Sequence, residues 1–334
     1  MDANNIALEI LGTGTHTPGT RVVSEEIDRR LGKRPGWIRD RTGVDVRSFV
    51  AAGEDVITMG ATAARAALLE AGVGARELDA IIAVGSLPHQ AIPCSAVFLQ
   101  RALGLGDRGI PAFDVNATCL GFLVALDLVA QCIATGRFRR VLLVASEVAT
   151  AGLNLDDPAT AGLFGDGAAA VVVGAARRSG PALLATHLET YAEGAEYCQV
   201  RAGGSGLHPR HDLDAFMAGT YFEMQGKATY RLAADRLPQF IDTLFSRAGV
   251  RPGDIDAWVP HQASGLAIAH LASMLAIPVE RLVMTLATRG NQISASIPTA
   301  LDAGRRDGRI RSGRLVALIG TGAGLSLGGA VLRI

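Results

Sequence analysis

The sequence predicts a layered α/β protein whose sheets are largely buried. Strand-like apolar runs alternate with helical runs along the chain, which is the pattern of that class. A hydrophobic content of 49% and a length of 334 residues indicate a compact globular chain with a sizeable core. No linker rich in proline, serine or charge separates two independent domains, and residues 174–181 are the best candidate for a junction.

The predicted elements follow one another in a regular order. Strand-like runs occupy residues 6–11, 80–84, 141–145, 168–173, 257–259, 315–319 and 330–334. Helical runs occupy residues 60–71, 120–134 and 228–248. The stretch 315–332 carries no charge and has the length of a membrane span. Its five glycines and two hydroxyl side chains indicate two strands joined by a glycine turn instead.

One short segment is repeated. Residues 114–119 and the apolar helix after them are echoed by residues 258–264 and the apolar run 266–276. Each copy reads as a strand, a polar turn with one reactive residue, and a helix. We therefore expect duplicated halves related by a pseudo-twofold axis, with Cys119 facing His261.

Charge and composition exclude several classes of partner. The 32 basic residues balance 32 acidic ones, so no overall field recruits nucleic acid or an anionic membrane. The first residues lack the basic region and cleavage site of a signal peptide, so we expect a cytoplasmic protein. The cysteines show no Cys-x-x-Cys spacing, and we expect free thiols and no metal site. They are Cys94, Cys119, Cys132 and Cys198.

Cys119 lies where a predicted buried strand passes into the helical run that begins at Leu120. At a helix N-terminus, unpaired N–H groups and the positive end of the helix dipole favour thiolate over thiol. Cys119 is therefore a candidate nucleophile that would attack an acyl thioester and form an acyl-enzyme. An isolated cysteine is more often a small buried hydrophobe, so this hypothesis needs partners elsewhere in the chain.

His261 and Asn291 are the candidate partners. Decarboxylation of a malonyl thioester makes a carbon nucleophile when donors stabilise the enolate oxygen. The ring N–H of His261 and the side-chain amide of Asn291 are neutral donors suited to that task. The other histidines have no matching partner and are expected to be structural or solvent-facing: His16, His89, His187, His208, His211 and His270.

Four motifs in register resemble β-ketoacyl-ACP synthase III, a family of the thiolase fold. They are residues 113–122, 163–168, 259–264 and 290–298, and the resemblance runs from Leu11 to Ile334. It implies a five-layered α/β/α/β/α homodimer and a triad of Cys119, His261 and Asn291. The implied halves are residues 1–178, with the nucleophilic cysteine, and residues 179–334, with the histidine and asparagine.

The resemblance also implies the reaction. Acyl-CoA would load Cys119, and the acyl group would then condense with malonyl-ACP or malonyl-CoA as CO₂ leaves. Acyl-CoA is thus expected as a substrate, with no permanently bound cofactor. An alternative within the fold stays open, in which the acyl group passes to an alcohol, an amine or a second acyl-CoA.

Further residues follow from the resemblance by position. Trp37, Arg41, Gly226, Tyr230 and Ser264 would contact CoA or its pantetheine arm, by aromatic stacking and phosphate pairing at the first two. The backbone N–H groups of Cys119 and Ala323 would form the oxyanion hole. Ile92 and Thr321 would line the acyl pocket, and Arg231 would contact the carrier protein.

The chain departs from the family pattern at two places. Ile92 and Thr321 stand where aromatic residues are usual, so we expect primers longer than acetyl to be accepted. Residues 265–274 contain no lysine or arginine, and Ser264 replaces the usual asparagine. This segment therefore offers no basic side chain that could pair with the acidic residues of a carrier protein.

Other enzyme classes fit less well. The dinucleotide-binding fingerprint fails because residues 12–17 and 322–327 each lack its third glycine. Residues 203–207 do not form the nucleophile elbow of a serine hydrolase. A degradative thiolase would need a second reactive cysteine near the C-terminus, but none follows Cys198. A non-catalytic subunit would be expected to lack Cys119.

Overall fold

The computed structural model describes residues 5–177 and 179–334, and its main strands form one continuous hydrogen-bonded order of nine strands, which the β1–β8 pairing divides into two sheets. The first sheet has the order β1-β7-β6-β4-β5, and the second has the order β8-β13-β12-β11. They join through a short antiparallel pairing of β1 with β8. The strand bounds are β1 (Ile6–His16), β4 (Ala80–Val84), β5 (Ala112–Val115), β6 (Arg140–Glu147), β7 (Gly167–Ala175), β8 (Ala182–Thr190), β11 (Ala257–Pro260), β12 (Leu315–Gly322) and β13 (Ser326–Arg333).

Two small two-stranded sheets lie outside this framework. They pair β2 (Thr20–Val23) with β3 (Val46–Phe49), and β9 (Cys198–Gln199) with β10 (Glu223–Met224). The helices are α1 (Ser24–Arg30), α2 (Trp37–Thr42), α3 (Val56–Ala71), α4 (Ser95–Ala102), α5 (Gly121–Ala134), α6 (Leu213–Gly219), α7 (Gly226–Ala248), α8 (Gly265–Met274), α9 (Leu286–Arg289) and α10 (Ser296–Arg306).

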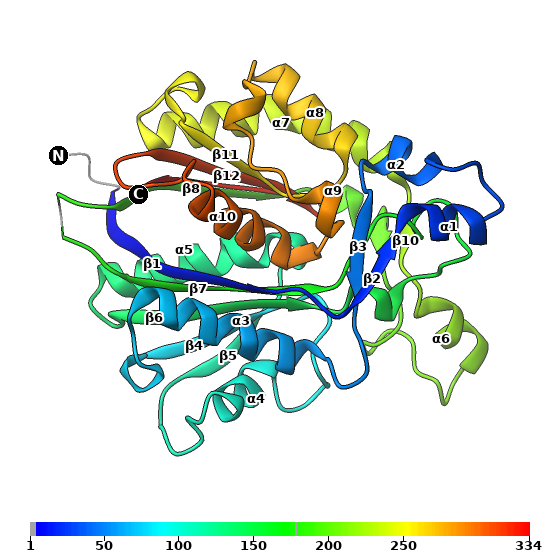
Figure 1. The fold of residues 1–334 in the computed structure, drawn as a ribbon, viewed down its shortest axis with the longest axis horizontal. Helices are drawn as coiled ribbons and strands as arrows, with labels where there is room; N and C mark the ends of the chain where they lie inside the picture. Colours follow the sequence, from blue (N-terminus) through cyan, green and yellow to red (C-terminus); the bar gives the residue numbers. More distant parts are fainter. Residues whose placement is uncertain (1–4, 178) are drawn as a thin grey trace.

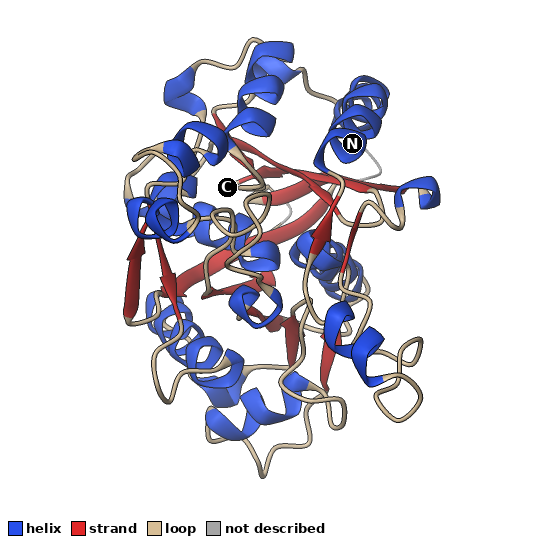
Figure 2. Cartoon of the chain, turned by 90° about the vertical axis from the view of Figure 1, so that its right-hand side faces the viewer, coloured by secondary structure: helices blue, strands red, loops and turns tan. Residues whose placement is uncertain are grey.

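Helices lie on both outer faces of the two sheets and between them, which makes five layers (Figures 1 and 2). Helices α3 and α4 pack on the outer face of the first sheet, and α7 and α8 pack on that of the second. Helices α5 and α10 fill the space between the sheets. The predicted five-layered α/β/α/β/α arrangement is confirmed.

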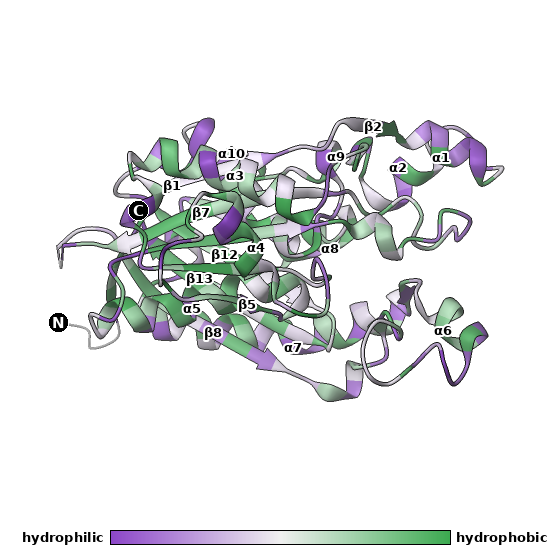
Figure 3. Cartoon of the chain, turned by 90° about the horizontal axis from the view of Figure 1, so that it is seen from below, coloured by the Kyte–Doolittle hydropathy of each residue, from purple (hydrophilic) through white to green (hydrophobic). Residues whose placement is uncertain are grey.

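The middle layer is the core of the molecule. Helix α5 is apolar around most of its circumference because a sheet covers it on each side, whereas α1 on the periphery is hydrophilic (Figure 3). The predicted strands and helices occur at their expected places. The uncharged stretch 315–332 forms β12, a turn and β13, as its glycines predict. Among the described residues, no helix combines the length and apolarity needed to cross a membrane.

The two halves repeat one topology. In the first, β1 pairs antiparallel with β7, β7 antiparallel with β6, and β6 parallel with β4. In the second, β8, β13, β12 and β11 repeat this order with the same directions. The expected boundary between residues 178 and 179 falls in the connection from β7 to β8, at residue 178, which lies outside the described residues.

The sequence echo paired the wrong turns. Cys119 lies in the 3-10 turn η2 (Thr118–Leu120) before α5, and the equivalent turn of the second half is η7 (Ile293–Ala295), before α10. His261 instead follows β11, the counterpart of β4. Helix α8 after it lies in an outer layer, and Leu266 is 69% exposed. An apolar run alone does not distinguish an outer helix from a middle one.

Strand β5 also differs from its prediction as a buried strand. It forms the edge of the first sheet, and Phe113 is 39% exposed. The glycine-rich start of the chain has a packing role. A Cβ on Gly12 or Gly14 would overlap the backbone of α3 at Ala67 or Ala63, so these glycines let α3 lie directly on β1.

Candidate active site

The turn that carries Cys119 is held in a strained conformation. Thr118 has a φ of +49°, in the left-handed region that a β-branched residue seldom adopts. Its backbone N–H donates to Oδ1 of Asn116 at 3.0 Å, which stabilises the turn. Cys119 follows directly, at the N-terminal end of α5. The backbone N–H groups of Ala323 and of Cys119 itself lower the pKa of the Cys119 thiol.

The Cys119 residue keeps partial exposure, but its sulfur is enclosed by protein. Burial is the main cause that raises the pKa of the Cys119 thiol to about 12, and the charge of Glu147 and the ionisable thiol of Cys198 add to it. The two backbone donors lower this pKa only in part. Desolvation therefore opposes the thiolate that the helix N-terminus favours. A base must take the thiol proton during the reaction.

His261 is buried at the end of β11. Its backbone N–H donates to the carbonyl of Ile319 on β12 at 2.7 Å. Burial lowers the pKa of the imidazole to about 4, so the ring is neutral near pH 7. Its Nδ1 atom is buried and has no hydrogen-bond partner among the described residues. A neutral imidazole can both accept a proton and donate a hydrogen bond.

Asn291 is buried in the turn before α10. Its backbone N–H donates to the carbonyl of Leu163 at 2.9 Å, and its carbonyl accepts from the N–H of Gly165 at 3.1 Å. Its side-chain Oδ1 accepts from the N–H of Ile293 at 2.9 Å. This bond orients the carboxamide, and no hydrogen bond of Nδ2 occurs within the described part of the chain. The amide N–H groups thus remain available as donors.

Glycines on β12 bring the three turns together. A Cβ on Gly320 would lie 2.7 Å from Cβ of His261 and 3.2 Å from Cδ2 of Leu120. A Cβ on Gly322 would lie 3.0 Å from Oγ1 of Thr118. Turn η2 also contacts η7, next to Asn291. The segments of Cys119, His261, Asn291 and Ala323 therefore meet at one end of the middle layer.

Buried polar residues that sequence reasoning missed hold this end in place. Gln262 is fully buried, and its Nε2 donates to the carbonyl of Pro260 at 2.7 Å. Its Oε1 accepts from the N–H groups of Thr285 and Leu286 at 2.9 and 3.0 Å. The strand that ends at His261 is thereby fixed to the segment that leads to Asn291. The only sequence signal for Gln262 was its place beside a candidate residue.

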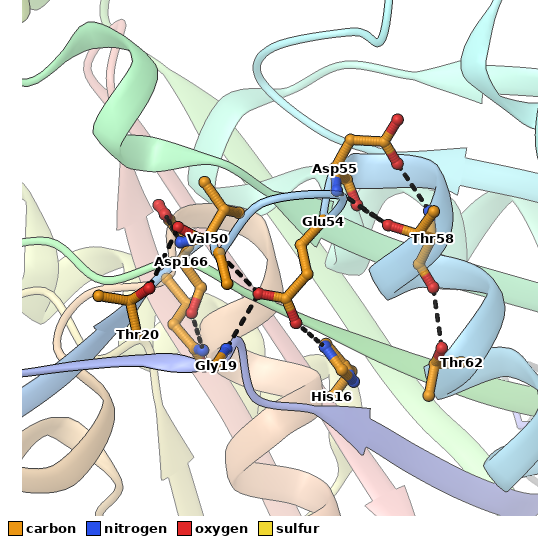
Figure 4. A network of polar contacts seen from close by, with 11 residues as sticks. His16, Gly19, Thr20, Val50, Glu54, Asp55, Thr58, Thr62 and Asp166 are labelled. Carbon is orange, nitrogen blue, oxygen red and sulfur yellow. Dashed lines mark hydrogen bonds and ion pairs between the residues drawn. The ribbon is translucent and has the colours of Figure 1, made fainter.

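Asp166 fastens the loops around motif 163–168. Its side chain accepts from the N–H of Val50 at 2.9 Å (Figure 4). It also accepts from the N–H of Thr150 at 2.9 Å and from the Thr150 hydroxyl at 2.7 Å. The same view shows Nε2 of His16 hydrogen-bonded to Glu54 at 2.9 Å. His16 therefore has a structural role, as expected, although its partner was not apparent from the sequence.

The candidate CoA residues lie on α2, α7 and α8. The Arg41 guanidinium lies 4.7 Å from the ring centre of Trp37, and Lys33 lies 5.5 Å from it on the same ring. Tyr230 contacts His270 edge-to-face at 5.4 Å. The Ser264 hydroxyl accepts from the N–H of Ala267 at 3.2 Å, so it caps α8.

The remaining candidates lie apart from one another. Gly226 and Arg231 are in the first turns of α7, and both are exposed. Thr321 lies on β12 between the glycines that contact His261 and Thr118. Ile92 lies in the loop after β4 and is 84% exposed.

Comparison with known proteins decides the family. The chain is 36% identical to a β-ketoacyl-[acyl-carrier-protein] synthase III of Methylococcus capsulatus, over 97% of this chain and 98% of that protein. The chain belongs to the β-ketoacyl-ACP synthase III family. Residues 113–192 match the family "3-Oxoacyl-[acyl-carrier-protein (ACP)] synthase III", and residues 245–334 match its C-terminal counterpart.

Solved structures of this synthase family agree with that assignment. A 3-oxoacyl-(acyl carrier protein) synthase III from Pseudomonas aeruginosa is 33% identical with a TM-score of 0.88, and 98% of each chain is covered. A priming β-ketosynthase from the R1128 polyketide biosynthetic pathway is 31% identical with a TM-score of 0.87, covering 98% of this chain and 96% of its own. This β-ketoacyl-ACP synthase III homologue is therefore an acyltransferase of the condensing type with the thiolase fold.

Proposed function

We propose that the chain transfers an acyl group from acyl-CoA to Cys119 and then condenses it with malonyl-ACP or malonyl-CoA. The observation that carries this proposal is the meeting of the Cys119, His261 and Asn291 turns, with a neutral imidazole at His261. A neutral donor pair stabilises an enolate oxygen without the reorganisation that a solvated site would need.

In the first half-reaction, the thiol of Cys119 attacks the thioester carbonyl of acyl-CoA. His261 accepts the thiol proton as the bond from sulfur to the carbonyl carbon forms, so no free thiolate has to accumulate. The N–H groups of Cys119 and Ala323 bind the oxyanion. Collapse of the tetrahedral intermediate breaks the bond to the CoA sulfur, and CoA leaves with the proton that His261 returns.

In the second half-reaction, the malonyl thioester loses CO₂, and its electron pair becomes an enolate. The ring N–H of His261 and the Nδ2 amide of Asn291 donate to the enolate oxygen. Burial keeps the imidazole neutral and so favours donation without proton loss. The enolate carbon attacks the acyl carbonyl on Cys119, and the new carbon–carbon bond forms as the bond to sulfur breaks.

In this proposal, residues on α2, α7 and α8 bind the CoA and carrier-protein thioesters. Trp37 offers an aromatic face, and Arg41 offers a guanidinium for phosphate. Helices α2 and α8 approach closely, because a Cβ on Gly43 would lie 3.3 Å from Cα of Gly265. In this proposal Gly226, Tyr230 and Ser264 receive the pantetheine arm. Arg231 is the carrier-protein contact, and acyl-CoA is a substrate without a resident cofactor.

The proposal extends to a cytoplasmic homodimer with duplicated halves at residues 1–178 and 179–334. Strand β5 is the last strand of the sheet order and presents the exposed Phe113, and Val97 is exposed on the adjoining α4. An open sheet edge with apolar side chains invites pairing with another strand. Pairing of β5 with a second copy would continue the sheet and bring the exposed Ile92 towards the partner's site.

Mass spectrometry of the intact protein tests the function. Incubation with a panel of acyl-CoA thioesters is expected to add one acyl mass, which malonyl-ACP or malonyl-CoA then removes as a β-ketoacyl product. Cys119→Ala is expected to abolish loading, and Cys132→Ala, on the same helix, is the matched control that keeps it. Discharge by an alcohol, an amine or a second acyl-CoA, and not by a malonyl thioester, would contradict the proposal.

A further inference from the structure

Glu147 is a buried carboxyl group beside the site that the proposed reaction does not use. It ends β6 and is fully buried. Its Oε1 accepts from the Ser294 hydroxyl at 2.6 Å and from the N–H of Ser86 at 2.9 Å. Its Oε2 is buried and has no hydrogen-bond partner among the described residues. Burial of a carboxyl group with half of its acceptor capacity unused is costly.

The turn that Glu147 binds is the internal counterpart of the nucleophile turn. Thr118 and Ile293 both have left-handed backbones, with φ of +49° and +50°. In each turn, the asparagine two residues before the strained residue accepts its N–H through Oδ1; this is Asn116 before η2 and Asn291 before η7. The residue after the strained position is Cys119 in the first turn and Ser294 in the second.

The strands behind the two turns are counterparts as well. The end of β12 lies against η2, and the end of β6 lies against η7. The Cys119 turn faces the end of β12, and the Ser294 side chain binds the carboxyl group of Glu147 at the end of β6. One turn therefore presents its side chain for chemistry. The other has its equivalent side chain fixed, which leaves the preceding Asn291 as its functional group.

We propose that Glu147 is a positioning residue that holds Asn291 in place through Ser294 and ties this turn to the loop after β4 through Ser86. The proposal rests on the function proposed above. Only two residues lie between Asn291 and Ser294, and the left-handed one of them, Ile293, needs anchors on both sides to keep its conformation. The Oδ1 bond of Asn291 is one anchor, and the Ser294–Glu147 bond is the other.

The charge of Glu147 also reaches the nucleophile. Burial raises the pKa of Glu147 to about 7, and its negative charge raises the pKa of Cys119. Cys198 is the other titratable group that acts on Cys119, through a thiol whose own pKa burial raises. His261 is neutral in this range and adds no charge. Neutralising Glu147 would therefore ease ionisation of Cys119 while loosening Asn291.

The test separates the two half-reactions in Glu147→Ala, Ser294→Ala and the double variant. Acyl loading of Cys119 is expected to persist, while single-turnover condensation with malonyl-CoA falls about tenfold or more, as loss of a charge-assisted bond allows. The double variant is expected to be no slower than the slower single variant, because both changes break one bond. Equal losses in loading and condensation, or additive losses, would overturn the proposal.

A pH profile gives a readout that a merely structural role would not move. In Glu147→Gln, the rate of Cys119 alkylation by iodoacetamide is expected to rise at a lower pH than in the unmodified protein. An unchanged profile would contradict the inference. Asp302→Asn is the matched control, because Asp302 is a buried carboxylate on α10 that accepts from Thr13 at 2.8 Å. It is expected to change stability without altering the ratio of loading to condensation.

The outcomes distinguish the two proposals. Unmodified protein that loads an acyl group but never condenses it would refute the proposed function. Condensation by the unmodified protein and at the same rate by Glu147→Ala would refute only the role of Glu147.

Discussion

At the scale of single residues, burial decides the chemistry of this site. It raises the pKa of Cys119 to about 12 and lowers that of His261 to about 4, so both groups are neutral at rest. A sequence shows that a cysteine precedes a helix, which favours the thiolate. It does not show how much protein encloses the sulfur, and this burial raises the pKa of the thiol. The resting ionisation state could not be read from the motif.

Removal of the imidazole is expected to separate the two half-reactions. In His261→Ala, acyl-CoA should still load Cys119, more slowly, because solvent replaces the base. Condensation should fall by about 10² to 10⁴, the range for loss of a positioned acid–base group. Rapid quench with labelled malonyl-CoA measures the second step on protein that is already loaded. Condensation at the unmodified rate would refute the role given to His261.

Stability should depend on pH through two opposing groups. His261 has a pKa lowered from 6.5 to about 4, so its contribution is complete above 6.5 and is lost as pH falls towards 4. Glu147 has a pKa raised from 4.5 to about 7, so its contribution is complete below 4.5 and is lost as pH rises towards 7. Each amounts to roughly 3 kcal/mol, and between pH 4.5 and 6.5 they cancel.

Replacing one of the two groups should reveal the pH dependence of stability that the other group causes. Glu147→Gln is expected to gain stability as pH rises from 4.5 to 6.5, relative to the unmodified protein, because only the histidine then titrates. His261→Gln is expected to lose stability over the same interval. Urea unfolding at pH 5 and pH 6.5 measures both differences. Parallel curves for the three proteins would contradict the opposing titrations.

At the scale of elements, close approach of glycine backbones sets the geometry. The Cβ that Gly320→Ala adds would lie 2.7 Å from Cβ of His261, so the histidine or β12 must move. We expect about 1–3 kcal/mol of destabilisation and a larger loss of condensation than of loading. Gly106→Ala is the matched control, since its Cβ meets no atom within 4 Å. Thermal unfolding and single-turnover assays together would show whether the two variants differ.

The elements themselves were predictable, but their equivalence was not. Apolar runs located β4, β6, β11 and most of α3 because local patterning specifies such elements. The repeat assigned from sequence paired the Cys119 turn with the His261 turn, and topology pairs it with the Asn291 turn. The two equivalent turns share an asparagine and, two residues later, a residue with a left-handed backbone. The backbone conformation is visible only in the structure. Gln262 and Glu147 were missed for a similar reason, because their partners come from distant segments.

At the scale of the whole molecule, the free edge of β5 predicts self-association. Phe113→Asp on this edge is expected to weaken a homodimer, because a charge would replace an apolar side chain at the interface. Sedimentation velocity at several protein concentrations measures the effect. Tyr221→Asp, another exposed aromatic residue, is the control and should leave the dimer intact. A monomeric unmodified protein at micromolar concentration would refute the proposed assembly.

Primer length depends on the same assembly, because Ile92 is exposed on its own chain and can limit an acyl pocket only from a second copy. A side chain smaller than an aromatic ring leaves room for longer primers, so octanoyl-CoA should have a higher kcat/KM than acetyl-CoA. Ile92→Phe should lower kcat/KM for octanoyl-CoA by about tenfold or more and leave that for acetyl-CoA nearly unchanged, since overpacking acts only where the chain is long. In the dimer-weakened Phe113→Asp background, this substitution should lose its effect. Equal or better use of acetyl-CoA by the unmodified protein would contradict the prediction.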